Sequence, residues 1–221
     1  MPRKKHHGLC PLCGREALLT RDHIPPDGIF LPPKPDNLIT VRTCRACNEG
    51  TKLDDEYFRL CLTPSPNASP EQWRLWNEKI YGSTLKRSPK LRSRLVQLTD
   101  AVKEHHKTSP LEFIDGTPLT DEQIEQTLSL EKSRIDRVVE KIVRCLYHHC
   151  TDAVLPGEIK ADISLVALKD HVDQLAEPCG TIGNHREFVF WYDGLAEVLG
   201  STWLLLFYEA QLFKAELHKA V

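Results

Sequence analysis

Apolar residues form two strand-like runs and one helix-like repeat in the N-terminal part of the chain. Residues 17–21 and 37–41 are rich in aliphatic and β-branched side chains, so each predicts a β-strand. The proline-rich residues 24–36 between them predict a loop, because proline interrupts helices and central strands. Residues 48–62 place apolar side chains three and four positions apart, which predicts a helix. The order of elements over residues 1–62 is therefore strand, loop, strand, helix.

A linker and a helical region follow. Residues 63–70 are rich in Pro and Ser, and Ser69-Pro70 is typical of the start of a helix, here predicted over 70–81. A longer helical stretch opens at Thr120 and keeps one apolar face to about Cys150. That face consists of Ile135, Val138, Val139, Ile142, Val143 and Leu146. We therefore predict that residues 71–152 are mainly helical.

The pattern changes after Pro156-Gly157. Residues 188–192 and 203–208 are continuous apolar and aromatic runs, which predict buried strands joined across 194–201. Residues 153–221 are therefore expected to combine helix and strand. The whole chain is predicted to be an α+β protein, with a module over 1–62, a linker over 63–70, a helical middle and this C-terminal region.

Two Cys-x-x-Cys pairs, Cys10/Cys13 and Cys44/Cys47, flank the two predicted strands of the module. Zinc prefers four tetrahedral thiolates, and a two-residue gap lets both cysteines of a pair reach one ion. Two disulfides are the alternative, but the charged N-terminus has no apolar core of a signal peptide. The other four cysteines also show no pairing framework. They are Cys61, Cys145, Cys150 and Cys179. We predict a structural zinc in a protein of a reducing compartment, the cytoplasm.

Composition narrows the class of protein further. A chain of 221 residues can bury a substantial core in one or two domains. Its 27% charged and 41% hydrophobic residues are ordinary for a soluble globular protein, and the net charge of −2 gives no global sign of nucleic-acid binding. The longest apolar run, residues 203–208, is far too short to span a bilayer, so no membrane partner is expected.

Two polar residues between the cysteine pairs, and one directly after the last cysteine, suggest hydrolytic chemistry. Hydrolysis of a phosphodiester needs a base that takes a proton from water and a cation that offsets negative charge. His23 can act as the base because imidazole titrates near neutral pH. Asp22 and Asn48 offer hard oxygen donors that suit Mg²⁺. Neighbours in an extended strand face opposite ways, so Asp22 can address a metal while His23 reaches the water, provided the strand end is twisted.

With these residues in place, the module resembles the HNH (ββα-metal) endonuclease family. The resemblance covers roughly residues 10 to 60, about a quarter of the chain. The shared positions are Cys10-x2-Cys13, Asp22-His23-Ile24-x-Pro26, Asn37-Leu38 and Cys44-x2-Cys47-Asn48.

The resemblance implies a role for each of these positions. His23 would be the general base, Asp22 and Asn48 would hold the catalytic metal, and Asn37 would orient the base. The four cysteines would hold a zinc that supports the fold. The implied activity is metal-dependent cleavage of DNA, as nicking or as cutting of both strands, with RNA left open as an alternative substrate.

One position departs from the family pattern. Many members carry a histidine four residues beyond the helix-start ligand, where this chain has Lys52. An ammonium does not bind a cation, so the expected metal is Mg²⁺ or Mn²⁺ rather than a transition metal held by several imidazoles. Lys52 is instead expected to contact phosphate. A basic run is a second candidate for contact with the nucleic-acid backbone. It comprises Lys86, Arg87, Lys90, Arg92 and Arg94.

Simpler interpretations exist for each residue. Asn37 can start a turn, Asn48 can cap its helix, Lys52 and the basic run can be solvated surface, and Asp22-His23 can be a surface dipeptide. At the level of function, the alternatives are a non-catalytic zinc module that binds nucleic acid and a protein whose C-terminal region does the work. A two-fold homodimer would let a single-site nuclease cut both strands.

Overall fold

The computed structural model describes residues 6–62, 69–87, 89, 93, 132–174, 177–195 and 198–220. Strands β1 (His6–Leu9), β2 (Glu16–Ile24) and β3 (Ile39–Cys44) form an antiparallel sheet in the order β1-β2-β3. A short 3-10 turn, η1 (Asp27–Ile29), lies in the proline-rich loop between β2 and β3. Helices α1 (Arg45–Gly50) and α2 (Lys52–Cys61) follow β3 directly.

These elements correspond to the predicted strands and helix, with shifted bounds. Strand β2 continues to Ile24, so Asp22 and His23 lie within the strand rather than after it. The helix begins at Arg45, three residues before the predicted start, and Thr51 separates α1 from α2. The second cysteine pair therefore lies at the first turn of a helix.

The helical part of the chain is described in two pieces. Ser69 Oγ accepts a hydrogen bond from the Gln72 N–H at 3.2 Å and caps α3 (Pro70–Arg74), as its sequence predicts. A π-helical stretch, η2 (Leu75–Thr84), and α4 (Leu85–Arg87) continue from it. The second piece is α7 (Lys132–Thr151). Residues 63–68 of the predicted linker 63–70, and the predicted helix start at Thr120, lie outside the described residues.

The C-terminal region is a five-stranded antiparallel sheet with the order β4-β8-β7-β6-β5. Its members are β4 (Ile159–Val166), β5 (Gly180–Ile182), β6 (Phe188–Asp193), β7 (Thr202–Phe207) and β8 (Gln211–Lys219), with a 3-10 helix, η3 (Leu168–Gln174), after β4. The two strands predicted from apolar runs are β6 and β7, and they pair with Trp191 opposite Leu204. The chain is thus an α+β protein, as predicted.

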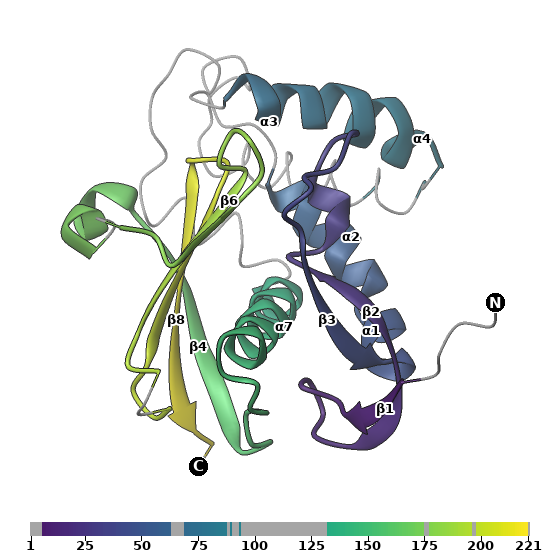
Figure 1. The fold of residues 1–221 in the computed structure, drawn as a ribbon. Coiled ribbons are helices and arrows are strands. Elements are labelled where there is room, and N and C mark those ends of the chain that lie inside the picture. Colours follow the sequence, from purple (N-terminus) through teal and green to yellow (C-terminus); the bar gives the residue numbers. More distant parts are fainter. Residues whose placement is uncertain are drawn as a thin grey trace.

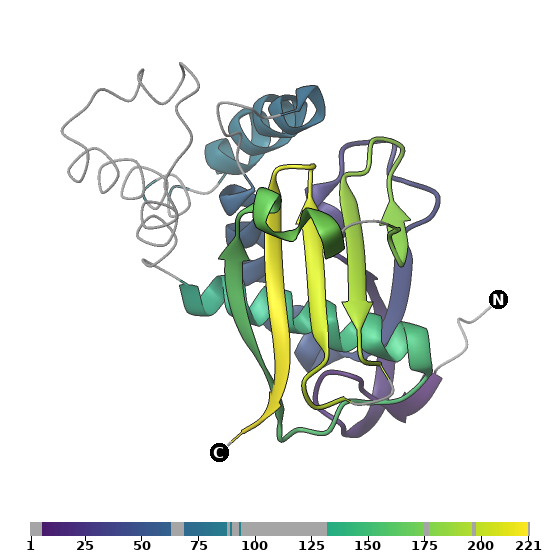
Figure 2. The ribbon, with the colours of Figure 1, turned by 90° about the vertical axis from the view of Figure 1, so that its left-hand side faces the viewer.

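Helix α7 lies between the two sheets (Figure 1), and Figure 2 shows it crossing behind the strands of the larger one. It packs against β4 and β8 on one side and against α2, β2 and β3 on the other. Because both sides are covered, α7 buries Lys141 and Arg144 as well as its apolar face. The sequence pattern predicts only the apolar side of this burial.

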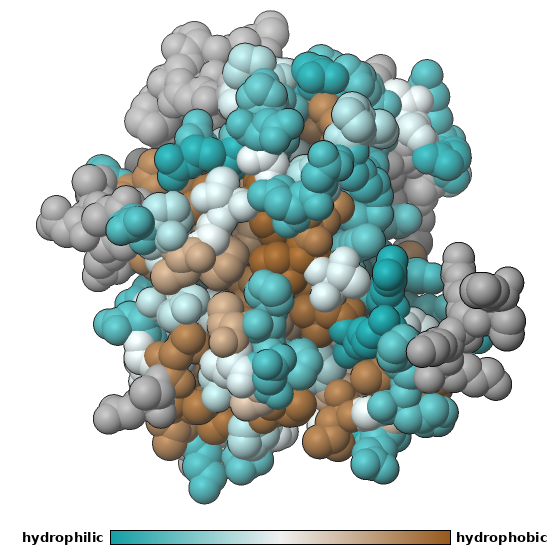
Figure 3. Space-filling view, viewed as in Figure 1, coloured by the Kyte–Doolittle hydropathy of each residue, from teal (hydrophilic) through white to brown (hydrophobic). Residues whose placement is uncertain are grey.

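One hydrophobic core joins the N-terminal strands and helices to the C-terminal sheet. The ring of Phe58 on α2 lies 5.2 Å from that of Phe207 and 5.6 Å from that of Phe213. Gln211 Nε2 donates to the Cys61 carbonyl at 2.8 Å, which adds a polar link. In the space-filling view, apolar residues gather along the seam between these parts (Figure 3). Among the described residues, no helix has the length and apolar character needed to cross a bilayer.

Candidate metal centre and adjacent pocket

The four cysteines of the two pairs come together in space. The Sγ atoms of Cys10, Cys13, Cys44 and Cys47 all lie within 4.8 Å of one another, and those of Cys13 and Cys44 are 3.9 Å apart. Four sulfurs bound at ~2.3 Å to a tetrahedral zinc would be ~3.8 Å apart, whereas a disulfide needs ~2.05 Å. The four are free cysteines, so the disulfide alternative is wrong here. This donor set fits a tetrahedral thiolate site for a metal such as zinc.

Backbone geometry shapes both cysteine pairs. Gly14 closes the first with a φ of +66°, where a larger residue would be strained, and its N–H donates to the Cys10 carbonyl at 2.8 Å. In the second, Cys44 Sγ accepts the Cys47 N–H at 3.4 Å and thereby caps α1. The Cys44 N–H donates to Cys10 Sγ at 3.3 Å. Such contacts favour the thiolate, which is the form that binds metal.

The thiols differ in how readily they ionise without a metal. Burial raises the pKa of Cys10 and of Cys47. Burial also opposes ionisation of Cys44, but the Cys47 N–H and the neighbouring thiols outweigh it, so the pKa of Cys44 is lowered. Since metal ligands must be deprotonated, metal binding by this cluster releases protons.

A pocket of about 380 Å³ lies between the end of β2 and the helices α1 and α2. Four residues singled out from the sequence line it together. They are Asp22, His23, Asn48 and Lys52. Within the part of the chain that is described, the cysteine cluster is the one group of His, Cys, Asp and Glu whose ligand atoms converge as a ready metal site. The pocket thus gathers the four predicted residues beside this cluster.

Asp22 is held rigidly on the inner wall of this pocket. Its side chain is only 7% exposed, and Oδ2 accepts the Thr43 hydroxyl at 3.1 Å. The same oxygen lies 3.3 Å from Lys141 Nζ, which reaches in from α7. The hydrogen bond from Thr43 and the ion pair with Lys141 thus both involve Oδ2 of this carboxylate.

Asn48 lines the pocket, and its amide nitrogen is fixed by β2. Its Nδ2 donates to the Arg21 carbonyl at 2.8 Å and to Thr20 Oγ1 at 3.2 Å. A carbonyl oxygen only accepts hydrogen bonds, so the NH₂ must point at β2 and Oδ1 must point away from it. Cys44 rather than Asn48 caps α1, so the interpretation of Asn48 as a helix cap is wrong.

His23 follows Asp22 in β2 and is half-buried. Both residues line the same pocket although they are neighbours in a strand. His23 Nδ1 is buried and has no hydrogen-bond partner among the described residues. An imidazole nitrogen is in general able to accept a proton, which is the role that the motif predicts for this residue.

Helix α2 adds Asp55, Glu56 and Arg59, which were not predicted from the sequence, to the predicted Lys52. Lys52, Asp55, Glu56 and Arg59 recur at intervals of three, one and three, which places them on one face of the helix, and all four line the pocket. That spacing was visible in the sequence as a polar stripe opposite the apolar one. Lys52 is exposed, with Nζ 3.9 Å from Glu49 Oε1.

The pKa values of two of these residues are shifted from their usual ranges. Burial raises the pKa of Asp55, although Lys141 acts in the opposite direction. Burial lowers the pKa of Arg59, whose Nη1 donates to the Gly28 carbonyl at 3.5 Å. A Cβ at Gly28 would lie 2.9 Å from that nitrogen, so glycine allows the loop to approach the guanidinium. Arg59 thereby forms a buried cationic wall of the pocket.

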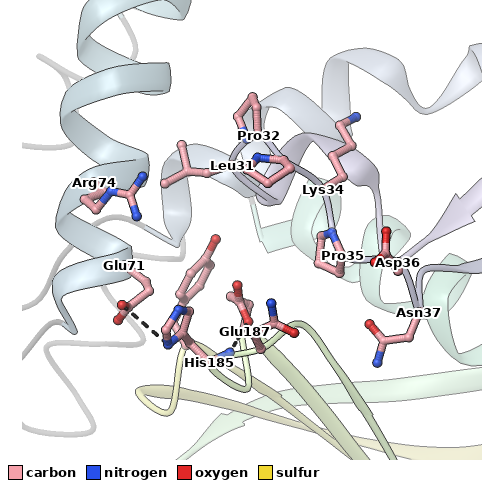
Figure 4. Close-up of a pocket in the computed structure, with 13 residues that line it drawn as sticks. Leu31, Pro32, Lys34, Pro35, Asp36, Asn37, Glu71, Arg74, His185 and Glu187 are labelled. Carbon is pink, nitrogen blue, oxygen red and sulfur yellow. Dashed lines mark hydrogen bonds and ion pairs between the residues drawn. The ribbon is translucent and has the colours of Figure 1, made fainter.

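The structure does not bring Asn37 to His23. Asn37 Nδ2 donates to the Thr181 carbonyl at 2.9 Å, and its Oδ1 accepts the Gly183 N–H at 3.2 Å. Asn37 instead lines a different pocket of about 600 Å³, in which His185 lies 3.7 Å from Glu71 (Figure 4). The nitrogen and the oxygen of its amide therefore tie the loop before β3 to the C-terminal sheet. These two side-chain hydrogen bonds of Asn37 do not go to His23.

The basic run lies only partly within the described residues. Lys86 and Arg87 end α4 and are exposed, and Arg87 contacts the Ser83 hydroxyl. Lys90, Arg92 and Arg94 lie outside the described residues. Contact between this run and a nucleic-acid backbone stays a prediction.

No protein-family model matches the chain, and no curated protein or solved structure matches it. The resemblance to HNH endonucleases therefore rests on the motif residues alone.

Proposed function

We propose that this protein is a divalent-metal-dependent endonuclease of the HNH type that hydrolyses phosphodiester bonds in DNA. One observation carries the proposal: Asp22, His23 and Asn48 line a single pocket beside the four-cysteine cluster. Pure binding of nucleic acid requires none of these three groups, whereas hydrolysis uses a base and oxygen ligands for a cation.

The cysteine cluster has a supporting role in this proposal. It joins the turn between β1 and β2 to the first turn of α1. A zinc bound there would fix the start of α1 and hence the position of Asn48, which directly follows Cys47. Four cysteine ligands would leave no open position on a bound zinc, as in structural rather than catalytic zinc sites.

The pocket residues divide the remaining work. Asp22 Oδ1 and Asn48 Oδ1 are the oxygens that would hold Mg²⁺ or Mn²⁺, which supplies positive charge to a bound phosphate. His23 accepts the proton of the attacking water. Arg59 and Lys52 offer positive charge to the phosphodiester from the α2 wall.

A non-catalytic nucleic-acid-binding module is the second candidate, and one contact favours it. Lys141 Nζ already neutralises Asp22, as expected for a carboxylate with a structural role. The two candidates differ in what happens to the DNA, because a binding module leaves a plasmid uncut whereas an endonuclease cleaves it.

The test is a nicking assay on supercoiled plasmid with the zinc-loaded protein. Wild type should relax the plasmid in Mg²⁺ or Mn²⁺ and be inactive in buffer freed of divalent cations by a resin, which spares the cysteine-bound zinc. His23→Ala should lower the nicking rate by ~10²–10⁴-fold, as expected for loss of a general base. DNA binding by gel shift and zinc content should not change.

His149→Ala is the matched control, because His149 is an exposed histidine on α7 and lines none of the described pockets. It should nick at the wild-type rate. Near-wild-type cleavage by His23→Ala would reject the assignment of the base. Plasmid that stays supercoiled with wild-type protein, despite a gel shift, would favour the binding module.

A further inference from the structure

Lys141 connects α7 to the wall of the proposed active site. Its side chain is 3% exposed, and Nζ lies 3.3 Å from Asp22 Oδ2 and 3.2 Å from Asp55 Oδ2. Nζ also donates to Thr51 Oγ1 at 3.0 Å, at the junction of α1 and α2. One buried ammonium therefore serves two carboxylates that both line the pocket.

Three other basic residues of α7 share the three- and four-residue spacing of Lys141 and form ion pairs with other acidic residues. Arg134 and Arg137 pair with Asp54, and Arg144 pairs with Glu140 and with backbone carbonyls after α7. Lys141 instead contacts two carboxylates that line the pocket, those of Asp22 and Asp55. Its role is therefore distinct from that of its neighbours on the helix.

We propose that Lys141 is a positioning residue that holds the Asp22 carboxylate in the pocket and opposes the binding of a divalent cation there. This inference rests on the proposed function in taking Asp22 as a ligand of that cation. Asp55 is the partner that keeps the ammonium in place, since Asp55 Oδ2 also contacts Thr51, at 3.3 Å.

The physical basis is competition between two cations for the same carboxylate. An ammonium bound to Asp22 repels a second positive charge at short range, and burial weakens the screening of that repulsion by water. A divalent ion thus binds weakly to the free protein. A bound phosphate contributes negative charge and offsets the repulsion, so cation binding becomes coupled to substrate binding.

The test measures Mn²⁺ binding by electron paramagnetic resonance in zinc-loaded protein without DNA. Lys141→Met removes the charge but keeps an unbranched side chain, and its Mn²⁺ dissociation constant should fall by at least about tenfold. Lys141→Arg keeps the charge and should bind Mn²⁺ as weakly as wild type. Lys160→Met is the control for loss of an exposed lysine and should not change Mn²⁺ binding, because Lys160 is half-exposed on β4 and lies 4.0 Å from Glu140.

A further variant distinguishes Mn²⁺ binding at Asp22 from a general effect of removing one positive charge. Asp22→Asn in the Lys141→Met background should abolish the gain in Mn²⁺ affinity if the ion binds at Asp22. An unchanged dissociation constant in Lys141→Met, with circular dichroism and zinc content like wild type, would overturn the proposal. Lys141→Gln provides a neutral side chain that still donates hydrogen bonds, in case Lys141→Met does not fold, and the same shift is required of it.

Failure here is distinguishable from failure of the proposed function. Mn²⁺ binding is measured without DNA, so a protein that does not nick plasmid can still show the predicted shift in Lys141→Met. Conversely, a protein that nicks through His23 but shows no shift retains the proposed function and lacks this role for Lys141.

Discussion

Asp54 is the clearest point at which the attachment of α7 can be tested. Asp54 as a residue is 9% exposed, and its two carboxylate oxygens accept hydrogen bonds from Arg134 Nε at 2.6 Å and Arg137 Nε at 2.8 Å. The Arg134 guanidinium also lies 4.5 Å from the centre of the Tyr57 ring. Burial opposes ionisation of Asp54, but the two arginines outweigh it, so the pKa of Asp54 is lowered. The contact joins α2 to the N-terminal half of α7.

Asp54→Ala should destabilise the protein by about 3 kcal/mol. A charge-assisted hydrogen bond contributes roughly 1.5–3 kcal/mol, and removal of one partner leaves the other poorly solvated. The Arg134 pair belongs at the upper end of that range because its side chains are 19% and 12% exposed. Arg137 is 53% exposed, so its pair contributes under about 1 kcal/mol after screening by water.

The assay is urea unfolding at pH 7.5, followed by tryptophan fluorescence and by far-ultraviolet circular dichroism. Both signals should give one coincident transition, because residues 6–62 share a core with the C-terminal sheet. Glu49→Ala is the control, since Glu49 makes an exposed pair with Arg45 at 3.0 Å and its loss should leave the free energy of unfolding close to that of wild type. A free energy of unfolding for Asp54→Ala within about 0.5 kcal/mol of wild type would refute the reasoning.

Two further predictions concern the metal cluster and a half-buried lysine. Cys47→Ser should lower bound zinc from one equivalent to none by elemental analysis, because a three-thiolate remainder binds far more weakly; one retained equivalent would contradict the assignment. Burial, with help from Arg59 and Lys34, lowers the pKa of Lys79 from its usual 10.5 to about 8, so the unfolded chain binds more protons between these values and stability rises with pH across them. Relative to Lys79→Met, wild type should gain about 1 kcal/mol of unfolding free energy from pH 8 to 10.5, a figure reduced for the partial exposure of the side chain; a flat difference would contradict the prediction.

The features that short-range patterns encode could be predicted. The spacing of Cys10, Cys13, Cys44 and Cys47 predicts a cluster because two residues between cysteines suffice to bring both thiols to one side of a turn. The apolar runs predict β6 and β7 almost to the residue, since central strands buried on both faces are continuously apolar. Both signals involve residues close in sequence.

The long-range contacts could not be predicted in the same way. Arg134, Arg137, Lys141 and Arg144 recur at intervals of three and four, but a basic stripe beside an apolar face ordinarily indicates solvent. Here Arg134, Lys141 and Arg144 are covered at least in part, because α7 lies between two layers and meets Asp22, Asp54 and Asp55 of the N-terminal part. Nothing in a single sequence indicates which acidic residues a basic stripe will meet. Asn37 shows the same limit, since its partners Thr181 and Gly183 lie far along the chain.

The arrangement of charges also limits what the resemblance of residues 10 to 60 can explain. The motif supplies Asp22, but the charge state of its surroundings depends on Lys141, which belongs to α7. Arg137, about one turn before Lys141, is anchored to Asp54. Release of that anchor should let α7 move relative to α2, and Lys141 would then hold Asp22 less firmly. Asp54→Ala is therefore expected to shift Mn²⁺ affinity in the same direction as Lys141→Met but by a smaller factor, because the ammonium is displaced rather than removed. On this account the chemistry of the pocket depends on how α7 docks as well as on the motif.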